Sequence, residues 1–310
     1  MKHIFIINPA AGKNKAACDM IPKIKSFGET KKLDFEIYET KGPGDATEYI
    51  KSLPESETIT RFYACGGDGT VFEVVNGAYG RENTQIAVIP LGSGNDFIRL
   101  FGKKEDLLDL DIHLNGKPTE LDLIKCGDIY AINQCSMGLD AEVNAKQSYF
   151  KKVPFMTGET AYVASVLYCF LKKVNNTFTI QIDDGEPYTQ DTVFCVAANG
   201  RWYGGGFMAA PLAIPDDGLL DFIIVKKNMS RAKLLSLMGK YKAGKHLDWD
   251  CTTFVRGKKI KLHCDEVAAV NCDGEKKYVN DITFELAEKR ITFVVPSNSS
   301  YFENKSSEKK

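Results

Sequence analysis

Apolar positions recur with two different rhythms along the chain. Over roughly the first hundred residues, short apolar runs that predict buried strands are separated by segments with the spacing of amphipathic helices. The predicted strands are residues 3–8, 34–39, 61–65 and 85–90, and the predicted helices are 16–27, 45–53 and 70–79. Strict alternation of strand and helix implies right-handed crossovers and a mainly parallel sheet, as in a Rossmann-like α/β domain. Ligands of such sheets bind at the carboxyl ends of the strands.

The second rhythm begins at about residue 118, where short strand-like runs follow one another with few helices between them. These runs are 120–125, 129–134, 177–182, 192–198, 220–225, 252–255, 259–262, 283–286 and 291–295. Regular spacing of short strands is typical of a β-rich, sandwich-like domain. Helices are expected only around 160–173 and 231–243. We therefore predict an α/β domain over 1–117 and a β-rich domain over 118–296. A polar tail follows over 297–310, part of which is expected to pack on the first domain.

Composition narrows the class of protein. A chain of 310 residues is long enough for two domains. Its formal net charge of -1 provides no overall attraction to nucleic acid, so no nucleic-acid partner is expected. The nine cysteines are scattered, odd in number and without a CxxC pair, which favours reduced, buried thiols over a disulfide framework or a zinc site. The expected location is therefore the cytoplasm.

No apolar run in the sequence is long enough to span a bilayer. The most apolar stretch, residues 161–171, has about half the length that a bilayer core requires. It is interpreted as a helix packed on a sheet, and the alternative is an apolar helix near a lipid-binding opening. Contact with a membrane is therefore expected only at its surface.

The most informative segment is YACGGDGTVF, residues 63–72. The apolar run ends at Gly66 and Gly67, which allow a sharp turn and close approach of a ligand to the backbone. Asp68 then lies in the turn, Gly69 leaves its flank bare, and Thr70 is a candidate cap for the helix that follows. A helix N-terminus after a glycine turn binds phosphate through free N–H groups and the helix dipole. The alternative interpretation is a plain strand-to-helix turn.

Two other loops fall at neighbouring strand ends. The first, Asn8-Pro9-Ala10-Ala11-Gly12, exposes backbone N–H groups beside two lysines and would suit a polyphosphate. Thr40 adds a hydroxyl where the second strand ends. The second loop follows the fourth strand, where glycines flank Ser93 and are followed by Asn95 and Asp96. Asp96 is a candidate site carboxylate or, equally, the cap of the next helix.

Two acidic turns occur in the β-rich region. Asp216-Asp217-Gly218 follows a triple glycine at 204–206, and Asp273-Gly274-Glu275 comes late in the chain. Each is interpreted either as a simple hairpin turn or as part of a site. The first turn would hold a hard cation through its carboxylate and nearby carbonyls.

Together these segments resemble the catalytic domain of the soluble diacylglycerol kinase family, the bacterial lipid kinases related to sphingosine and ceramide kinases and more distantly to NAD kinase. The resemblance runs from Ile4 to about Val295. Its motifs occur in order: NPxxG at 8–12, GGDGT at 66–70, NG at 76–77, PLGSGNDF at 90–97, YGGG at 203–206, PxAxxDDGxLD at 211–221 and DGE at 273–275.

The resemblance implies an NAD-kinase-like first domain, a β-sandwich-like second domain and an ATP site in a cleft between them, with Mg²⁺ as cofactor. The positions that match the family's nucleotide-contacting residues are Asn8, Pro9, Ala10, Ala11, Gly12, Thr40, Gly66, Gly67, Asp68, Gly69, Thr70 and Ser93. Asp68, Asp96 and Asp273 match carboxylates needed for turnover, and Glu275 matches the position often assigned as the base. Asp217 matches a structural Mg²⁺ site, with the carbonyls of Ile214 and Leu219 as co-ligands.

The activity implied by the family is ATP-dependent phosphorylation of a lipid hydroxyl, with diacylglycerol converted to phosphatidic acid. Sphingoid bases, ceramide and monoacylglycerol remain alternative acceptors. NAD kinase shares GGDGT but should lack the PLGSGNDF loop, and sphingosine-type kinases usually have a small residue where this chain has Asp96. A nucleotide-binding regulator without turnover is disfavoured because all four carboxylates are present. Whether the chain forms a homodimer is left open.

The lipid acceptor is expected at the inner surface of the membrane, where the protein would bind peripherally. The best apolar candidates for its groove are Phe150, Val153, Phe155 and Met156, which are equally well interpreted as core or loop residues. Lys151 and Lys152 beside them would attract an anionic surface.

Overall fold

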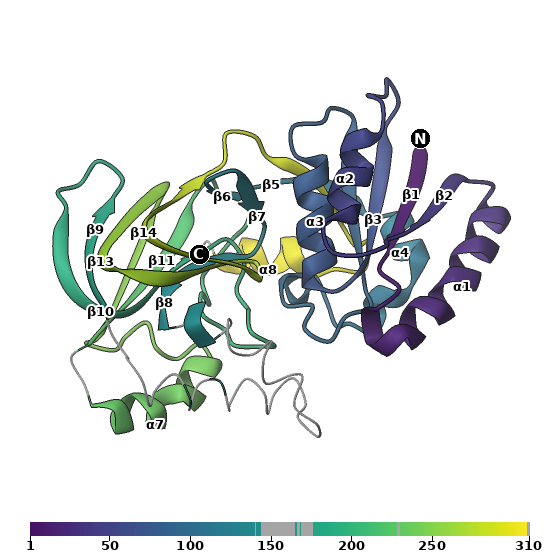
Figure 1. Cartoon of the computed structure of the whole chain (residues 1–310). Coiled ribbons are helices and arrows are strands. Elements are labelled where there is room, and N and C mark those ends of the chain that lie inside the picture. The colour runs from purple at the N-terminus through teal and green to yellow at the C-terminus, as the bar shows by residue number, and fades with distance from the viewer. Residues whose placement is uncertain (140, 144–164, 166–167, 169–175, 228–229, 309–310) are drawn as a thin grey trace. The chain divides into compact units, whose positions relative to one another are not determined.

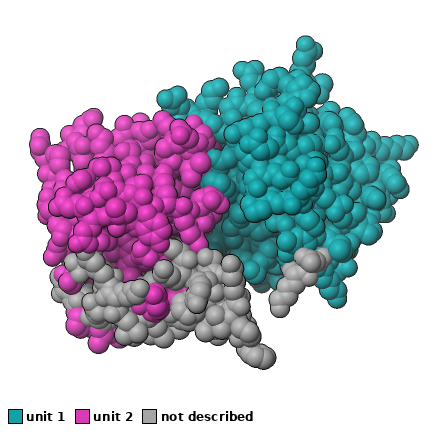
Figure 2. All heavy atoms as spheres, in the orientation of Figure 1, with its two compact units in different colours: residues 1–122, 288–310 teal, residues 123–287 magenta. Residues whose placement is uncertain are grey.

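The computed structural model describes residues 1–139, 141–143, 165, 168, 176–227 and 230–308. The chain forms two compact units (Figures 1 and 2). Unit 1 comprises Met1–Asp122 and Glu288–Lys310, and unit 2 comprises Leu123–Ala287. The predicted lipid-groove residues at 150–156 and almost all of the predicted helix at 160–173 lie outside the described residues. Among the described residues, no helix has both the length and the apolar character needed to cross a membrane.

Unit 1 is built on a six-stranded sheet in the order β2-β1-β3-β4-β15-β5. Its strands are β1 (Lys2–Ile7), β2 (Asp34–Glu39), β3 (Thr60–Gly66), β4 (Thr84–Pro90), β5 (Lys117–Leu121) and β15 (Ile291–Val295). Every neighbouring pair is parallel except β15 and β5, which are antiparallel. β3 is buried along its whole length, as a continuous apolar run in a doubly covered parallel sheet should be.

The helices of unit 1 follow the strands as the sequence predicts. They are α1 (Lys15–Lys31), α2 (Asp45–Ser52), α3 (Asp68–Ala78), α4 (Leu110–Leu114) and α8 (Tyr301–Glu308), with short 3₁₀ helices η1 (Ala11–Asn14), η2 (Phe97–Leu100) and η3 (Asp106–Leu108). Met20 and Ile24 of α1 pack with Phe5 and Tyr63 of the sheet in one buried cluster. The predicted α/β architecture is therefore confirmed.

Two strands that the sequence pattern assigned to the second region lie in the sheet of unit 1. β15 pairs with β4 and β5, although it comes near the end of the chain. The buried Asp122 carboxylate accepts a hydrogen bond from Arg290 Nε at 2.7 Å, where the chain leaves and re-enters this unit. In the tail, the Tyr301 ring lies 5.2 Å from the Phe101 ring. Alternating apolar residues identify a strand, but they do not identify the sheet that it joins.

Unit 2 is a nine-stranded sheet in the order β12-β11-β10-β8-β13-β14-β6-β7, with β9 paired to β10 and β13. Its strands are β6 (Ile124–Cys126), β7 (Ile129–Ala131), β8 (Gln134–Gly138), β9 (Asn176–Ile182), β10 (Tyr188–Ala198), β11 (Leu220–Lys226), β12 (Thr252–Gly257), β13 (Lys259–Cys272) and β14 (Glu275–Leu286). Helix α7 (Arg231–Lys242) is capped by Ser230, whose hydroxyl accepts a hydrogen bond from the Lys233 amide. The predicted β-rich region is therefore confirmed.

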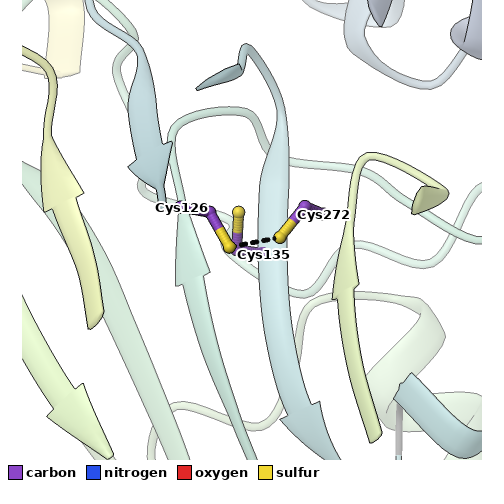
Figure 3. Close-up of side chains that lie close together, drawn as sticks. All are labelled: Cys126, Cys135 and Cys272. Atoms are coloured by element: carbon purple, nitrogen blue, oxygen red, sulfur yellow. Dashed lines mark hydrogen bonds between the residues drawn. The ribbon is translucent and has the colours of Figure 1, made fainter. Parts of the chain in front are cut away.

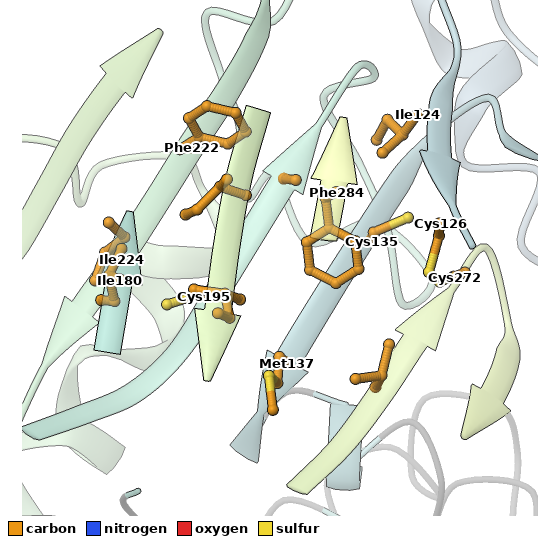
Figure 4. Close-up of a cluster of buried hydrophobic side chains, with 14 of the residues drawn as sticks. Ile124, Cys126, Cys135, Met137, Ile180, Cys195, Phe222, Ile224, Cys272 and Phe284 are labelled. Carbon is orange, nitrogen blue, oxygen red and sulfur yellow. Dashed lines mark hydrogen bonds between the residues drawn. The ribbon is translucent and has the colours of Figure 1, made fainter. Parts of the chain in front are cut away.

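The second half of β10 is buried on both faces of the sheet. Along β10, Phe194, Val196 and Ala198 belong to one apolar cluster. The alternating Cys195 and Ala197 belong to another, which is drawn in Figure 4. β13 pairs with β9 over its first half and with β8 over its second half. An irregularity between His263 and Ala268 separates the two halves, and such a bulge bends a strand.

Candidate active site

The carboxyl ends of β1, β3 and β4 carry three loops that are hydrogen-bonded to one another. The Asn8 amide donates to the Cys65 carbonyl at 3.1 Å, which joins the first loop to the end of β3. The Leu91 and Gly92 amides both donate to the Gly66 carbonyl, at 2.8 and 3.0 Å. The Thr40 amide donates to the Ile7 carbonyl and lies at the same edge of the sheet. The predicted nucleotide-contacting segments of unit 1 are therefore brought together.

Close packing within the protein requires glycine at two positions in these loops. A Cβ atom on Gly66 would lie 2.1 Å from the Thr70 hydroxyl oxygen. A Cβ on Gly92 would lie 2.4 Å from the Gly67 Cα. Gly69, by contrast, is exposed and would meet nothing within 4 Å. The backbone at the start of α3 is thus bare on one side, as binding of phosphate at a helix N-terminus requires.

Asp68 is the first residue of α3 and holds the neighbouring glycine loop in place. Its carboxylate oxygens accept hydrogen bonds from the Asn95 amide at 2.8 Å and the Asp96 amide at 2.7 Å. Burial raises the pKa of the Asp68 carboxyl, and the two amide donors act against that rise. A Cβ on Gly94 would lie 2.5 Å from an Asp68 oxygen, so a side chain there would break this contact.

The prediction that Thr70 caps the helix is wrong. Gly67 occupies the N-cap position, and no side chain makes a capping hydrogen bond there. Thr70 lies inside the first turn, where its hydroxyl accepts a hydrogen bond from the Asn8 side-chain amide at 3.3 Å. Helix α3 begins at Asp68, two residues before the predicted start at residue 70, because the glycine turn is shorter than the apolar spacing indicates.

Asp96 does not cap the helix that follows it. It occupies the N-cap position of η2 but makes no capping hydrogen bond with its side chain. Instead its carboxylate, with only 6% of the side chain exposed, accepts a hydrogen bond from Arg99 Nε at 3.1 Å. Ser93 is exposed in the same loop. Asp96 therefore remains a candidate site carboxylate.

The sequence pattern did not identify two positively charged side chains that lie near this loop. Arg99 Nη2 donates to the Gly94 carbonyl at 3.2 Å, and Lys104 Nζ donates to the Gly92 carbonyl at 2.5 Å. Positive groups beside a glycine loop suit a bound phosphate. The spacing of Asp96 and Arg99, three residues apart, was the available signal, since such side chains meet on one helix face.

In unit 2, Asp273 closes a loop around its carboxylate. Oδ2 accepts hydrogen bonds from the Ile132 and Asn133 amides at 2.7 and 3.0 Å. Oδ1 accepts one from the Gln134 amide at 2.7 Å. Asp273 has a φ of 47°, a left-handed conformation that aspartate tolerates better than most residues. Glu275 is exposed at the start of β14, and no described residue forms a hydrogen bond with its carboxylate.

The Asp217 turn also lies in unit 2, immediately before β11. Asp217 Oδ1 accepts a hydrogen bond from the Leu219 amide at 3.0 Å, and Gly218 has a φ of 78°. Arg256 donates to Asp221 at 2.9 Å and lies 3.9 Å from Asp217. Burial raises the pKa of Asp221 to about 6, and its Oδ2 is buried with no hydrogen-bond partner among the described residues.

This turn has the donors that a hard cation takes. Mg²⁺ prefers carboxylate and carbonyl oxygens and keeps several waters. Asp217 would supply a carboxylate, and the half-buried Ile214 and Leu219, which are near it in the chain, would supply backbone carbonyls. Arg256 binds only one carboxylate oxygen of Asp221, so the unpartnered oxygen leaves negative charge that would favour a cation. The residues therefore fit a structural Mg²⁺ site.

Unit 1 also has a cavity of about 510 Å³, which is not lined by the residues of the glycine loops. Thr84 and Ile291, the first residues of β4 and β15, are among the residues that line it. It is therefore at the amino ends of the strands, opposite the glycine loops. The hydrogen-bonded loops, which carry the candidate chemistry, define the site in unit 1 better than this cavity does.

Comparisons with known proteins agree with this arrangement. Residues 2–126 match the model of the diacylglycerol kinase catalytic domain. Residues 133–295 match the YegS C-terminal NAD kinase beta sandwich-like domain. The chain therefore belongs to the family of lipid kinases that combine these two domains, and the resemblance seen in the sequence is confirmed.

Individual relatives extend over most of the chain. YtlR of Bacillus subtilis (strain 168), which is designated a lipid kinase, is 30% identical over 295 residues, covering 89% of this chain and 94% of its own. A protein named diacylglycerol kinase from Staphylococcus carnosus (strain TM300) is 29% identical, covering 87% of each chain.

Solved structures agree in fold. A crystal structure from Bacillus anthracis str. Sterne, assigned as a diacylglycerol kinase, has a TM-score of 0.74 with 25% identity and covers 95% of both chains. An NAD kinase from Archaeoglobus fulgidus, solved in complex with ATP, has a TM-score of 0.54 with 15% identity and covers 99% of this chain and 98% of its own. The latter likeness concerns the fold alone.

Proposed function

We propose that this protein transfers the γ-phosphoryl group of ATP to the hydroxyl of a lipid, with diacylglycerol as acceptor and phosphatidic acid as product. The observation that carries the proposal is the hydrogen-bonded junction of Asp68 with the loop at Asn95 and Asp96, beside the bare helix start at Gly69. Membership of the lipid kinase family and the names of its relatives support the choice of a lipid acceptor.

Phosphoryl transfer depends on positioning and charge neutralisation more than on covalent chemistry from the protein. In this proposal, the amides at the start of α3 and the loop at Asn8 to Gly12 hold the triphosphate, and Arg99 and Lys104 add positive charge. Mg²⁺, when bound with the nucleotide, supplies further neutralisation. Asp68 fixes the glycine loop through two charge-assisted hydrogen bonds.

The two acidic residues of the DGE turn take different roles in this proposal. Asp273 already accepts hydrogen bonds from three backbone amides, so its lone pairs are committed to holding the turn. Glu275 is exposed, and no described residue competes for its carboxylate. A general base must reach the proton that it abstracts. We therefore assign Glu275 as the base that accepts the proton of the lipid hydroxyl, and Asp273 as a residue that positions it.

Lipid phosphorylation tests this function directly. Purified protein with radiolabelled ATP and Mg²⁺ should label diacylglycerol in mixed micelles or vesicles, with product resolved by thin-layer chromatography. The panel should also contain monoacylglycerol, ceramide, sphingosine, undecaprenol and NAD. Preferred labelling of another lipid would replace the acceptor, and labelling of NAD alone would exclude the lipid kinase function.

Glu275→Gln should lower kcat by about 100-fold or more, the usual contribution of a general base. The melting temperature Tm should not change, because the side chain is exposed and carries no described hydrogen bond. Glu186→Gln is the matched control, since Glu186 is also an exposed glutamate of unit 2. Wild-type kcat in the Glu275 variant would remove it as the base.

The Asp217 turn should bind Mg²⁺ for structural reasons. Mg²⁺ titrated without nucleotide should raise Tm of the wild type, because a ligand that binds only the folded state stabilises it. Asp217→Asn should abolish most of that rise, as measured by scanning calorimetry. The same titration of Asp183→Asn, which alters an aspartate in another turn of unit 2, should match the wild type. If Mg²⁺ does not change the Tm of the wild type, the proposal is contradicted.

A further inference from the structure

Three cysteines from distant parts of the sequence meet in the core of unit 2. Cys126 ends β6, Cys135 lies in β8, and Cys272 ends β13. Their sulfur atoms all lie within 4.8 Å of one another. Figure 3 shows the three side chains pointing toward one another. The residues are 1%, 0% and 1% exposed, respectively. Among the described residues, this is the one group of three or more histidine, cysteine or acidic ligands placed closely enough to share an ion.

Within the group, Cys126 differs chemically from the other two cysteines. The Cys272 thiol donates a hydrogen bond to Cys126 Sγ at 2.7 Å. Hydrogen bonds from the Cys135 and Cys272 thiols, together with the charge of Lys277, lower the pKa of Cys126 to about 3, against the opposing effect of burial. The pKa of the Cys135 thiol is raised instead, mainly by burial, and that of Cys272 is raised mainly by its hydrogen bond with Cys126. Burial also raises the pKa of Cys195 in the same apolar cluster.

We propose that Cys126, Cys135 and Cys272 form a binding site for a soft, thiophilic cation such as Zn²⁺ or Cu⁺. Thiolates are the ligands that select such ions, and they bind Zn²⁺ at about 2.3 Å. Sulfurs around one Zn²⁺ ion therefore lie about 3.8 Å apart, and every pair here is within reach of that separation after a small movement. The proposal is independent of the lipid kinase function.

Charge in the core also suits a cation. Three thiolates with one divalent ion carry a net charge of about -1. Lys277 is half-buried beside them and donates through Nζ to the Cys126 carbonyl at 3.5 Å. Its positive charge offsets the remaining negative charge, so the loaded site would be close to neutral. A buried charge without such a partner would be costly.

The site would brace the DGE turn. Cys272 directly precedes Asp273, and Cys135 directly follows Gln134. The Gln134 amide donates a hydrogen bond to the Asp273 carboxylate. An ion shared with Cys126 would therefore fix both sides of that hydrogen bond to β6. A structural role of this kind predicts that the ion stabilises the fold, because metal bound only by the folded state adds to its stability.

Metal uptake by the whole chain tests the proposal. Reduced, metal-free protein should take up one equivalent of Zn²⁺, measured against a competing chelator. Cd²⁺ as a probe should give an ultraviolet thiolate charge-transfer band, and Cu⁺ supplied as a chelate should compete with both. Saturation should raise Tm by roughly 5 to 10 °C, the shift expected when the metal is about 100-fold above its Kd.

Single substitutions locate the metal site, and a measurement on the wild-type protein tests the proposal even if a variant fails to fold. Cys135→Ser should lower metal affinity at least tenfold, whereas Cys195→Ser, a buried cysteine outside the group, should keep it. Should the first variant fold poorly, X-ray absorption of the zinc-loaded wild type must show sulfur neighbours. Absence of uptake, equal uptake by Cys135→Ser, or a Cys126–Cys272 disulfide in the purified protein, detected as a loss of two hydrogens in mass, would each overturn the proposal.

Discussion

Asp68→Ala is expected to lower kcat for lipid phosphorylation on the order of 100-fold or more. The substitution removes a negative charge at the junction of β3 and α3 and the acceptor of two amide hydrogen bonds from Asn95 and Asp96. The loop that is expected to hold the nucleotide would then lose its fixed position. Positioning errors of this kind are costly in phosphoryl transfer, because positioning supplies most of the catalysis.

A second substitution separates the catalytic role of Asp68 from its structural role. Asp68→Asn keeps one carbonyl oxygen as acceptor and should retain most of the loop contact, yet it lacks the charge. It should fold with a Tm close to that of the wild type and still show a large loss of kcat. Steady-state kinetics and calorimetry of the same preparations measure both quantities.

Asp183→Ala provides the control for loss of a carboxylate that holds a turn. Asp183 Oδ1 accepts hydrogen bonds from the Lys258 and Lys259 amides, both at 2.8 Å. The Asp183→Ala variant should lose some stability and keep its kcat.

If Asp68→Ala retained near wild-type activity, the GGDGT segment would be only a plain strand-to-helix turn.

Asp273→Ala is expected to have the largest effect on stability. It leaves the amides of Ile132, Asn133 and Gln134 without their shared acceptor, and each unpaired buried group costs about 1–3 kcal/mol. Alanine is also less tolerant than aspartate of the left-handed φ of 47°. Even the lower bound for the three groups, about 3 kcal/mol, corresponds to a fall in Tm of about 10 °C.

Asp273→Asn isolates the hydrogen bonds from the backbone conformation, because asparagine tolerates the same φ. One of its side-chain atoms becomes a donor facing a backbone donor, so most of the stability loss should remain. Activity should fall in both variants, since Glu275 follows only two residues later. A Tm equal to that of the wild type in Asp273→Ala would contradict the assignment of Asp273 as the residue that holds the turn.

The sequence predicted the strand–helix alternation of unit 1 because buried parallel strands and amphipathic helices have distinct apolar periods. It also predicted that the loops at Asn8, Gly66 and Gly92 share one edge, because parallel strands bring their carboxyl ends together. Ordered motifs from NPxxG to DGE predicted the family. Each of these features depends on local spacing along the chain, which a single sequence displays.

Other features required the tertiary structure. The sequence did not indicate that β15 joins the first sheet, because an alternating strand fits either sheet equally well until its partners are known. It also did not distinguish Asp273 from Glu275, since only the fold brings the amides of 132–134 to one carboxylate. The lack of a CxxC pair argued against a metal site, yet the sheet gathers Cys126, Cys135 and Cys272 in one core. The sequence by itself thus determined the elements, the family and the loops at strand ends. Long-range pairing alone decided which side chains meet, because those contacts depend on strand register and sheet order rather than on neighbouring residues.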